Sequence, residues 1–275
     1  MVVFPNSKIN LGLRIVNKRN DGYHDLDTVF YPLPFYDALE VIRNVGVNGA
    51  GIKDFDFTIT GLPIEETTDN LCQRAFQLLK NDFPDLPPVN MHLHKAIPVG
   101  AGLGGGSADA SFTLTLLNSK FQLGLTTEQL LQYALKLGSD CPFFIINKPC
   151  HATGRGEFLQ PVDLGLSSYK FVLINPGIHI STGEAFSGTV PAIPVRSTLE
   201  IISQPVHTWK DELMNDFEKT IFPAYPEIEK IKTSLYEQGA LYASMSGTGS
   251  SVYGIFEKNR RLNLKVQSHY FYKEI

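Results

Sequence analysis

The sequence predicts an α+β fold, in which strands and helices are mixed without strict alternation. Near the N-terminus, apolar residues alternate with more polar neighbours over residues 9–15, which is the period of a half-buried strand. After a dense run of glycines, apolar residues recur at helical spacing over residues 108–116. A doubly wound parallel sheet would instead alternate strand and helix along the chain, so the mixed order favours α+β.

The first half of the chain is expected to contain both strands and helices. Strands are expected over residues 9–15, 37–43, 55–60 and 89–93. The first helix should begin near Asp69, a good N-cap residue, because the apolar residues that follow share one face. A second helix should follow the glycine run. A third is expected over residues 127–137, with Gly138 as its C-terminal stop.

The second half of the chain should begin with an apolar strand over residues 169–174, which ends in Asn-Pro-Gly, a turn signal. Helical spacing continues over residues 197–203, 207–218 and 226–238. Strands are then expected over residues 241–244, 252–256 and 269–273. The first two of these strands flank a Gly-Thr-Gly turn.

The composition is that of a globular protein with one large domain or two of ordinary size. The 275 residues are 43% hydrophobic and 19% charged, which is enough to bury a core. A net charge of -4 disfavours non-specific nucleic-acid binding. No apolar run reaches the roughly 18 residues of a membrane span, and the N-terminus lacks the pattern of a signal peptide. We therefore expect a cytoplasmic protein that binds neither nucleic acid nor membrane.

The three cysteines, Cys72, Cys141 and Cys150, have no spacing typical of a metal site. Their odd number argues against a disulfide framework, which agrees with a reducing compartment.

The segment Pro98–Asp109 (PVGAGLGGGSAD) carries the strongest chemical signal, because five of the seven residues over 100–106 are glycine. Glycines let the backbone adopt positive φ and let N–H groups approach a bulky anion. The helix that follows directs its N-terminal dipole at the same point. Ser107 adds a hydroxyl that can reach a phosphate or its metal ion. The segment therefore predicts a phosphate-binding loop.

Three known types of phosphate loop fit this segment poorly. A Walker A loop needs Lys before Ser or Thr, but Gly106 stands there. The dinucleotide fingerprint is matched, yet it requires an acidic residue about 20 positions on, and that region has none until Glu128. The glycine loop of a protein kinase joins two strands, whereas this one enters a helix. The segment is therefore a strand, a glycine loop and a helix that together belong to none of these three types.

The sequence resembles the GHMP kinases, whose three short motifs occur here in the fixed order of that family. They are Pro5–Gly12 (PNSKINLG), the loop Pro98–Ala110, and Met245–Ser251 (MSGTGSS). The resemblance implies a two-domain α+β fold with the active site between the domains. Residues 1–158 would form an N-terminal domain like ribosomal protein S5 domain 2, which carries the ATP loop. Residues 159–275 would form a ferredoxin-like C-terminal domain.

Four further segments resemble the diphosphocytidyl-methylerythritol kinase branch more than the mevalonate, homoserine or galactose kinases. They are Asp21–His24, Gly138–Phe144, Ala152–Glu157 and Asn215–Glu218. The resemblance implies transfer of the γ-phosphoryl group of ATP to the 2-hydroxyl of 4-diphosphocytidyl-2-C-methyl-D-erythritol, a cytidine diphosphate conjugate of a methylated polyol. This reaction belongs to the non-mevalonate route to isoprenoid precursors. One small departure is Ala108, where a second serine is more usual.

The resemblance implies two catalytic residues, Asp140 and Lys8. Asp140 would be the general base, which requires its carboxylate within about 3 Å of the substrate hydroxyl. The Lys8 ammonium would keep Asp140 ionised and offset developing negative charge. A lone Asp before Cys-Pro is usually a helix cap and a lone Lys in a strand is usually solvated, so the assignment depends on the motifs.

The substrate and cofactor residues are also implied by the resemblance. Tyr23 and Phe186 would stack on cytosine, although Phe186 could instead pack in the core. His24 and Asn10 would hydrogen-bond the cytosine and neighbouring polar groups, and Thr182 would orient Asp140. The third motif would complete the substrate site with Gly247 and Gly249.

Binding of ATP and Mg²⁺ is assigned to the glycine loop and two residues outside it. The loop residues expected to contact ATP are Pro98, Gly100, Gly102, Leu103, Gly104, Gly105, Gly106 and Ser107. Asn70 and Lys95 would contact adenine or ribose. Ser107 is the expected protein ligand to Mg²⁺, which would arrive bound to ATP.

Two other functions compete with this interpretation. The first is a GHMP kinase for a different alcohol, such as mevalonate or homoserine, which Tyr23-His24 and Thr182 with Phe186 disfavour. The second is a non-catalytic RNA-binding module, which the net charge and the Lys8–Asp140 pair disfavour. A small molecule is the only partner expected, and the chain should be a monomer or a weak homodimer.

Overall fold

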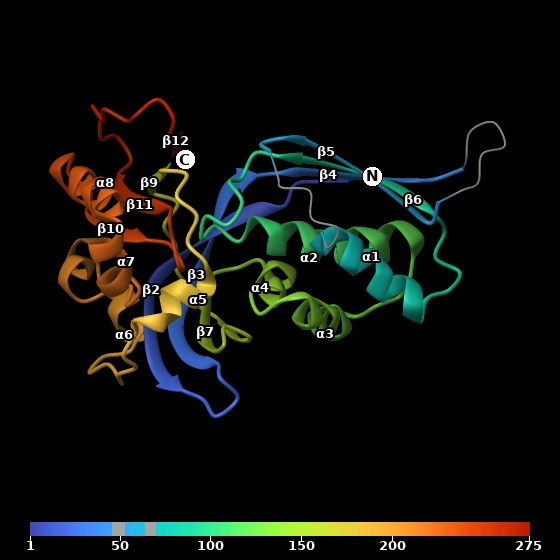
Figure 1. Cartoon of the computed structure of the whole chain (residues 1–275), viewed down its shortest axis with the longest axis horizontal. Coiled ribbons are helices and arrows are strands. Elements are labelled where there is room, and N and C mark those ends of the chain that lie inside the picture. The colour runs from blue at the N-terminus through green and yellow to red at the C-terminus, as the bar shows by residue number, and fades with distance from the viewer. Residues whose placement is uncertain (46–52, 64–69) are drawn as a thin grey trace. The chain divides into compact units, whose positions relative to one another are not determined.

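A computed structural model describes residues 1–45, 53–63 and 70–275 (Figure 1). The chain divides into two compact units. One comprises residues 1–7, 34–99 and 104–147, and the other comprises residues 8–33, 100–103 and 148–275. The division of domains at residue 158 stays a prediction, because compact units defined by proximity and domains defined along the sequence need not coincide.

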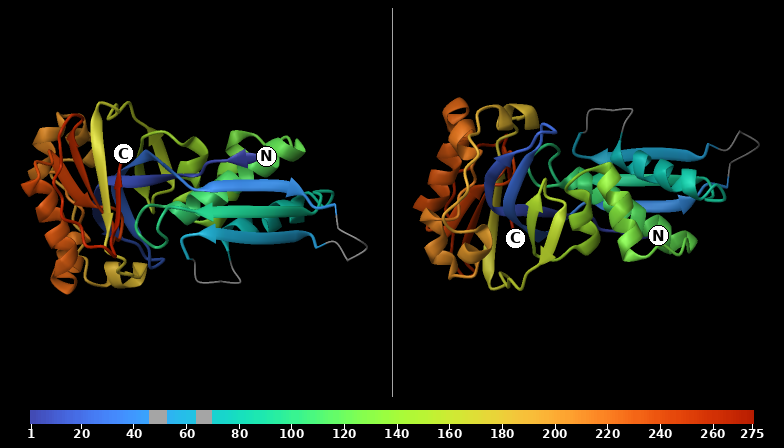
Figure 2. Two further views of the ribbon diagram at one scale, coloured as in Figure 1. Left: turned by 90° about the horizontal axis from the view of Figure 1, so that it is seen from above. Right: turned by 90° about the horizontal axis from the view of Figure 1, so that it is seen from below.

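The first unit packs helices on one four-stranded sheet. The strands lie in the order β1-β4-β6-β5, and only the β5–β6 pair is parallel. Their bounds are Val2–Val3 for β1, Ala38–Arg43 for β4, Phe55–Gly61 for β5 and Val89–Lys95 for β6. The helices are α1 (Leu71–Asp82), α2 (Gly105–Phe121), α3 (Thr127–Leu137) and α4 (Cys141–Ile146). The two views of Figure 2 show this sheet from one side and the helices from the other.

The core of the first unit lies between the sheet and its helices. Alternate residues of β4 and β6 point into it, as period-2 strands require, and meet apolar residues of α1 and α2. Helix α2 contacts other elements on more than one side. Nine of its residues are therefore buried, and it has no continuous polar face. The chain's phosphate-loop segment therefore leads into a rigid helix.

Two helix boundaries follow from local capping. The Asn70 side chain accepts a hydrogen bond from the Cys72 backbone N–H (2.8 Å), so Asn70 is the N-cap of α1, whereas Asp69 lies outside the described residues. Helix α3 matches the expected range, because Thr126 and Gln129 form a capping box and Gly138 ends the helix.

The second unit contains two four-stranded sheets. One has the order β2-β3-β7-β8, with bounds Asn6–Lys18, His24–Tyr36, Cys150–Gly154 and Phe158–Pro161. The other has the order β10-β11-β9-β12, with bounds Tyr242–Met245, Val252–Glu257, Tyr169–Asn175 and Phe271–Glu274. The helices are α5 (Thr182–Ser187), α6 (Thr198–Ile202), the 3-10 helix η1 (Val206–Asp211), α7 (Glu218–Ala224) and α8 (Pro226–Glu237).

The expected helix over residues 207–218 is wrong in its second half. The 3-10 helix ends at Asp211, and the chain then extends along β2. There Leu13 N donates to Met214 O and Asp216 N donates to Leu13 O, each at 2.8 Å. These long-range backbone bonds satisfy the groups that a helix would have paired locally, which sequence spacing cannot reveal.

The state of the cysteines and the length of the helices bear on two expectations from composition. Cys72, Cys141 and Cys150 are free thiols and all are buried. Among the helices of the described residues, none is both long and apolar enough to cross a membrane.

Candidate active site

The glycine loop contains three glycines with left-handed backbone conformations before helix α2 begins. Gly100, Gly102 and Gly104 have φ of 63°, 75° and 71°, in the left-handed region that favours glycine. Gly104 is the N-cap of α2, and Gly105 opens the helix. The loop therefore ends with backbone N–H groups that α2 itself leaves without helical partners, as at any helix N-terminus.

Gly102 touches the third motif too closely for any side chain. A Cβ atom at this position would lie 1.9 Å from the carbonyl oxygen of Ser246. The Ser246 hydroxyl donates to Gly102 O at 2.8 Å, and Ser251 N donates to Ala101 O at 3.2 Å. The second and third motifs are therefore joined backbone to backbone.

The first motif meets the same loop residues. Lys8 N donates to Leu103 O at 2.9 Å, and Asn10 N donates to the Ser246 hydroxyl at 3.3 Å. The Tyr253 hydroxyl donates to Asn10 O at 2.7 Å. All three motifs that the sequence singles out thus converge on residues 100–103.

Asn10 holds the side chain of Lys8. The Lys8 ammonium donates to Asn10 Oδ1 at 2.6 Å and lies 4.7 Å from the centre of the Phe30 ring. Asn10 Nδ2 in turn donates to Thr28 Oγ1 at 3.0 Å. Lys8 and Asn10 are both buried, so this contact fixes the direction of the ammonium.

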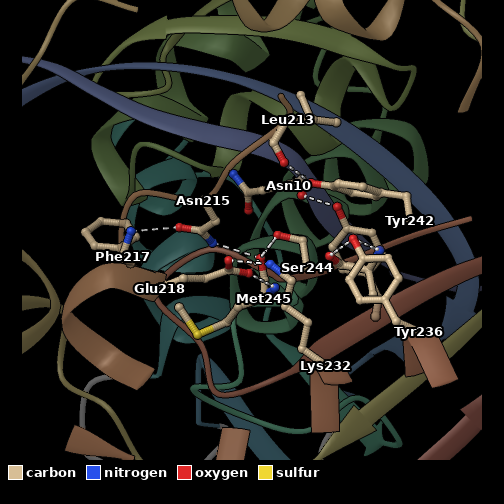
Figure 3. A network of polar contacts seen from close by, with 12 residues as sticks. Asn10, Leu213, Asn215, Phe217, Glu218, Lys232, Tyr236, Tyr242, Ser244 and Met245 are labelled. Atoms are coloured by element: carbon tan, nitrogen blue, oxygen red, sulfur yellow. Dashed lines mark hydrogen bonds and ion pairs between the residues drawn. The ribbon is translucent and has the colours of Figure 1, made fainter. Parts of the chain in front are cut away.

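Asn215 holds the backbone of the third motif (Figure 3). The Asn215 amide donates to Met245 O and to Gly247 O, each at 2.8 Å, and its Oδ1 accepts from Phe217 N at 3.0 Å. Gly247 and Gly249, at φ of 57° and 94°, turn the chain back beyond β10. One buried amide thus fixes the backbone where β10 leads into the turn.

Glu218 fixes the strand that leads into this turn (Figure 3). Its Oε1 accepts from Met245 N at 2.8 Å and from the Ser244 hydroxyl at 3.1 Å. Its Oε2 accepts from the Lys232 ammonium at 2.6 Å. Because the carboxylate is nearly buried, these charge-assisted bonds are worth more than surface pairs.

A buried ionic triad lies beneath the start of α2. The Lys95 ammonium pairs with Asp37 and, at 2.8 Å, with Asp109. Asp37 Oδ1 also accepts from Ala96 N at 2.6 Å and Ile97 N at 2.9 Å. The triad therefore ties the end of β6 to the first turns of α2.

The triad also explains the glycine at position 105. A Cβ atom there would lie 3.0 Å from the Lys95 ammonium nitrogen. Lys95 is only 1% exposed and is held by both carboxylates, so it supports the loop from within the protein. The contact of Lys95 with adenine or ribose stays a prediction, and in this structure its ammonium is engaged by Asp37 and Asp109.

The charges of the triad depend on one another. Burial favours neutral forms, but the two carboxylates outweigh it and raise the pKa of Lys95. Burial, together with Asp37, raises the pKa of Asp109 to about 7 against the opposing effect of Lys95. Asp109 Oδ1 is buried without a hydrogen-bond partner in the described part of the chain, so this carboxyl is the least satisfied of the three groups.

Asp140 is partly buried at the N-cap position of α4, directly before Cys141 and Pro142. Ser111 links this helix start to the glycine loop, because its hydroxyl contacts Ser107 O at 2.8 Å and Cys141 O at 2.7 Å. Asp140 and Ser107 belong to the first compact unit, and Lys8 belongs to the second. The α2–α4 contact therefore positions Asp140 relative to Ser107.

The aromatic residues expected to bind cytosine occupy two separate contacts. His24 stacks on Phe186, with ring centres 4.7 Å apart, and Phe186 meets Phe217 edge-on at 4.8 Å. Tyr23 is 53% exposed, and the Arg155 guanidinium lies 4.6 Å from its ring centre. Burial and the charge of Lys18 lower the pKa of His24, which keeps the imidazole neutral at pH 7.

The remaining expected residues are placed as follows. Thr182 is exposed and opens α5 behind its N-cap Ser181. Pro98 precedes the loop between Ile97 and the exposed Val99. Among the described residues, no cluster of three or more His, Cys, Asp or Glu side chains forms a metal cage.

Sequence reasoning missed two supporting residues, Asp37 and Asp109. Asp109 lies inside the glycine-loop segment, so its position drew attention, but the sequence did not show its pairing with Lys95. Asp37 drew no attention, because its partner Lys95 is 58 residues away in sequence.

Comparison with known families agrees with the fold and with the second and third motifs. The model of the GHMP kinases N terminal domain matches residues 70–148, and the model of the GHMP kinases C terminal domain matches residues 201–270. A solved mevalonate kinase from Methanococcus jannaschii covers 94% of this chain and 92% of its own at a TM-score of 0.63, with 11% identity, which shows the shared fold. The protein is a kinase of the GHMP class.

Relatives with higher sequence identity show to which branch of the GHMP kinases the chain belongs. A 4-diphosphocytidyl-2-C-methyl-D-erythritol kinase of Bacteroides fragilis is 52% identical over 95% of this chain and 94% of its own. A kinase of the same name from Porphyromonas gingivalis is 43% identical over 96% of this chain and 94% of its own. A crystal structure of 4-(cytidine 5'-diphospho)-2C-methyl-D-erythritol kinase has a TM-score of 0.78 at 30% identity, over 94% of this chain and 91% of its own. The chain belongs to the 4-diphosphocytidyl-2-C-methyl-D-erythritol kinase family, which confirms the resemblance.

We predict that Asn215→Asp weakens the third motif. The substitution keeps the shape but replaces two donors with a carboxylate that faces the carbonyls of Met245 and Gly247. Loss of two buried hydrogen bonds should cost about 2–4 kcal/mol in the free energy of unfolding. KM for ATP should rise as well, because the third motif holds the glycine loop through Ser246 and Ser251. Denaturant unfolding and steady-state kinetics measure both quantities.

A matched control is Asn118→Asp, because the Asn118 amide also bonds a backbone carbonyl, that of Leu125 at 3.0 Å. This control should lower stability and leave KM unchanged. An Asn215→Asp enzyme with normal KM and normal stability would contradict the supporting role of Asn215.

We predict that Lys95→Met destabilises the protein by about 3–5 kcal/mol, because it leaves two buried carboxylates without their cation. Adding Asp109→Asn should recover part of that loss, since it removes one of the two buried carboxyl groups while Asp37 keeps its two backbone donors. Thermal or denaturant unfolding of the two single variants and the double variant gives the coupling energy. Simple additivity of the two single effects would show that the triad does not act as a unit.

Proposed function

We propose that this protein transfers the γ-phosphoryl group of ATP to the 2-hydroxyl of 4-diphosphocytidyl-2-C-methyl-D-erythritol and releases the 2-phosphate and ADP. The observation that carries the proposal is the 52% identity, over 95% of the chain, to a kinase of that name. The convergence of the three motifs on residues 100–103 supports it, because phosphoryl transfer depends mostly on positioning and charge stabilisation.

Asp140 is the general base in this proposal. It accepts the proton of the substrate hydroxyl as that oxygen attacks the γ-phosphorus of ATP. Its position at the start of α4, linked to the loop through Ser111, supports the role, since the base must stay in register with the phosphates. Thr182 orients the carboxylate.

Lys8 offsets the negative charge that develops during transfer. Its hydrogen bond to Asn10 and its contact with the Phe30 ring fix the ammonium, which supports a role that requires one direction. The amide of Asn10 is engaged by Lys8 and Thr28, so we propose that Asn10 acts on the substrate chiefly by placing Lys8.

The glycine loop holds the triphosphate with the residues named above, from Pro98 to Ser107. Mg²⁺ usually keeps several waters and binds through substrate phosphates with one or two protein ligands, so it needs no cage of side chains. The Ser107 hydroxyl fits that need, because it lies in the first turn of α2. We therefore propose Mg²⁺ bound to ATP, with Ser107 as its protein ligand and Asn70 near the nucleoside.

Cytosine recognition is proposed for Tyr23, Phe186 and His24. A neutral His24 imidazole can donate or accept a hydrogen bond at the base edge, and its stack on Phe186 fixes the ring plane. Gly247 and Gly249 bring backbone close to the substrate. The protein is proposed to work in the cytoplasm as a monomer or a weak homodimer, without nucleic-acid partners.

The test is an ATP-consumption assay with the cytidyl substrate, mevalonate and homoserine, applied to the wild type and to Asp140→Asn. The wild type should phosphorylate only the cytidyl substrate. Asp140→Asn should lose on the order of 10²–10⁴ in kcat, because the amide keeps the shape but cannot accept the proton. Its affinity for ATP should stay within about threefold.

The exposed Asp85→Asn in the same unit is the matched control and should keep wild-type kinetics. Greater turnover of mevalonate or homoserine by the wild type would contradict the proposed substrate. Retention of more than about a third of kcat in Asp140→Asn would contradict the proposed base.

A further inference from the structure

Arg155 has no role in the function proposed above, yet the turn that carries it is tightly built. It lies between β7 and β8, flanked by Gly154 and Gly156, whose φ values are 66° and 102°. Gly156 N donates to Thr153 O at 3.1 Å and closes the turn. A Cβ atom at Gly154 would lie 2.6 Å from Phe158 and 2.8 Å from Glu157 Oε2, so the turn leaves room only for glycine there.

Glu157 sets the direction of the Arg155 side chain. Its Oε1 lies 3.3 Å from Arg155 Nε, and its Oε2 accepts the backbone N–H of Arg155. The Glu157 side chain is only 11% exposed, and that of Arg155 is 30% exposed. The arginine is therefore held at its base by a nearly buried carboxylate while its terminal N–H groups extend beyond that contact.

The guanidinium reaches the ring of Tyr23, 4.6 Å from its centre, on the hairpin between β2 and β3. That hairpin is closed by Arg19 N, which donates to Tyr23 O at 2.8 Å, and by Tyr23 N, which donates to Asp21 Oδ1 at 3.1 Å. Arg155 is close enough that its charge contributes to lowering the pKa of Asp21, after the Tyr23 backbone bond and Arg19. Two segments far apart in sequence thus meet at one exposed aromatic ring.

The two rings proposed for cytosine differ in how they are held. Phe186 is fixed between His24 and Phe217. Tyr23 is 53% exposed and has no aromatic ring against it among the described contacts, so the planar guanidinium is what restrains it. A planar cation suits the face of an aromatic ring better than a compact ammonium does.

We propose that Arg155 is a positioning residue for base recognition, which covers one face of Tyr23 and thereby presents the other face to the cytosine of the substrate. The inference rests on the proposed function, because it deepens the specificity of that site. Arg155 acts through Tyr23, contributes no proton or charge to phosphoryl transfer, and does not affect ATP.

The first test is the KM of the cytidyl substrate for Arg155→Ala, with kcat and the KM for ATP measured alongside. Loss of a cation–π contact at an exposed ring should raise the cytidyl KM about 2- to 5-fold and leave the other two constants unchanged. Arg155→Lys should resemble Arg155→Ala, because the charge remains while the planar stack is lost.

The decisive test combines Arg155→Ala with Tyr23→Ala. If Arg155 acts only through the ring, removing it from the Tyr23→Ala enzyme should change the cytidyl KM by less than about 1.5-fold. Full multiplication of the two single effects would show that Arg155 acts independently of the Tyr23 ring and would overturn the inference.

Arg260→Ala is the matched control, since Arg260 is an exposed arginine whose Nε, like that of Arg155, bonds to an oxygen, here Gln238 O at 3.0 Å. It should leave all constants unchanged. A wild-type enzyme inactive on the cytidyl substrate would reject the proposed function itself. If the wild type is active on the cytidyl substrate and Arg155→Ala has the same cytidyl KM as the wild type, this inference alone is rejected.

Discussion

The backbone contact between Gly102 and Ser246 is the constraint on which the proposed ATP site depends. It brings the second and third motifs together at a distance that excludes even a methyl group, and the first motif joins the same residues through Lys8 and Leu103. Short motifs separated by nearly the whole chain therefore become one surface. The glycine at position 102 is explained by this approach as well as by its positive φ.

Two sets of buried polar residues, one in each compact unit, hold the segments that carry the motifs. Asn215 and Glu218 hold the third motif through its backbone. The buried hydroxyls of Ser246, Ser250 and Ser251 in that motif bond to Gly102, Ile178 and Asn175. Beneath α2, the triad around Lys95 ties the loop's exit to the end of β6. Buried polar networks of this kind stabilise one conformation when most of their groups are paired, and removing a single partner is costly.

Local sequence patterns predicted much of the fold but few of the long-range side-chain contacts that hold it together. The strand over residues 9–15 and the helix over 127–137 followed from spacing and capping, and the three motifs predicted the kinase class. The helix expected over 207–218 failed in its second half because Met214 and Asp216 bond to Leu13 of β2, and no local pattern encodes that pairing. The partnerships of Asp37 with Lys95 and of Tyr23 with Arg155 were likewise hidden, since each joins residues brought together only by tertiary folding.

Gly102→Ala measures the central contact most directly. The added methyl group must displace the Ser246 backbone and adopt a φ that costs a non-glycine residue about 1–2 kcal/mol, so both the melting temperature and the affinity for ATP should fall. Gly165→Ala is the matched control, because nothing lies within 4 Å of its Cβ position. A Gly102→Ala protein that melts with the wild type and binds ATP with unchanged affinity would contradict the account.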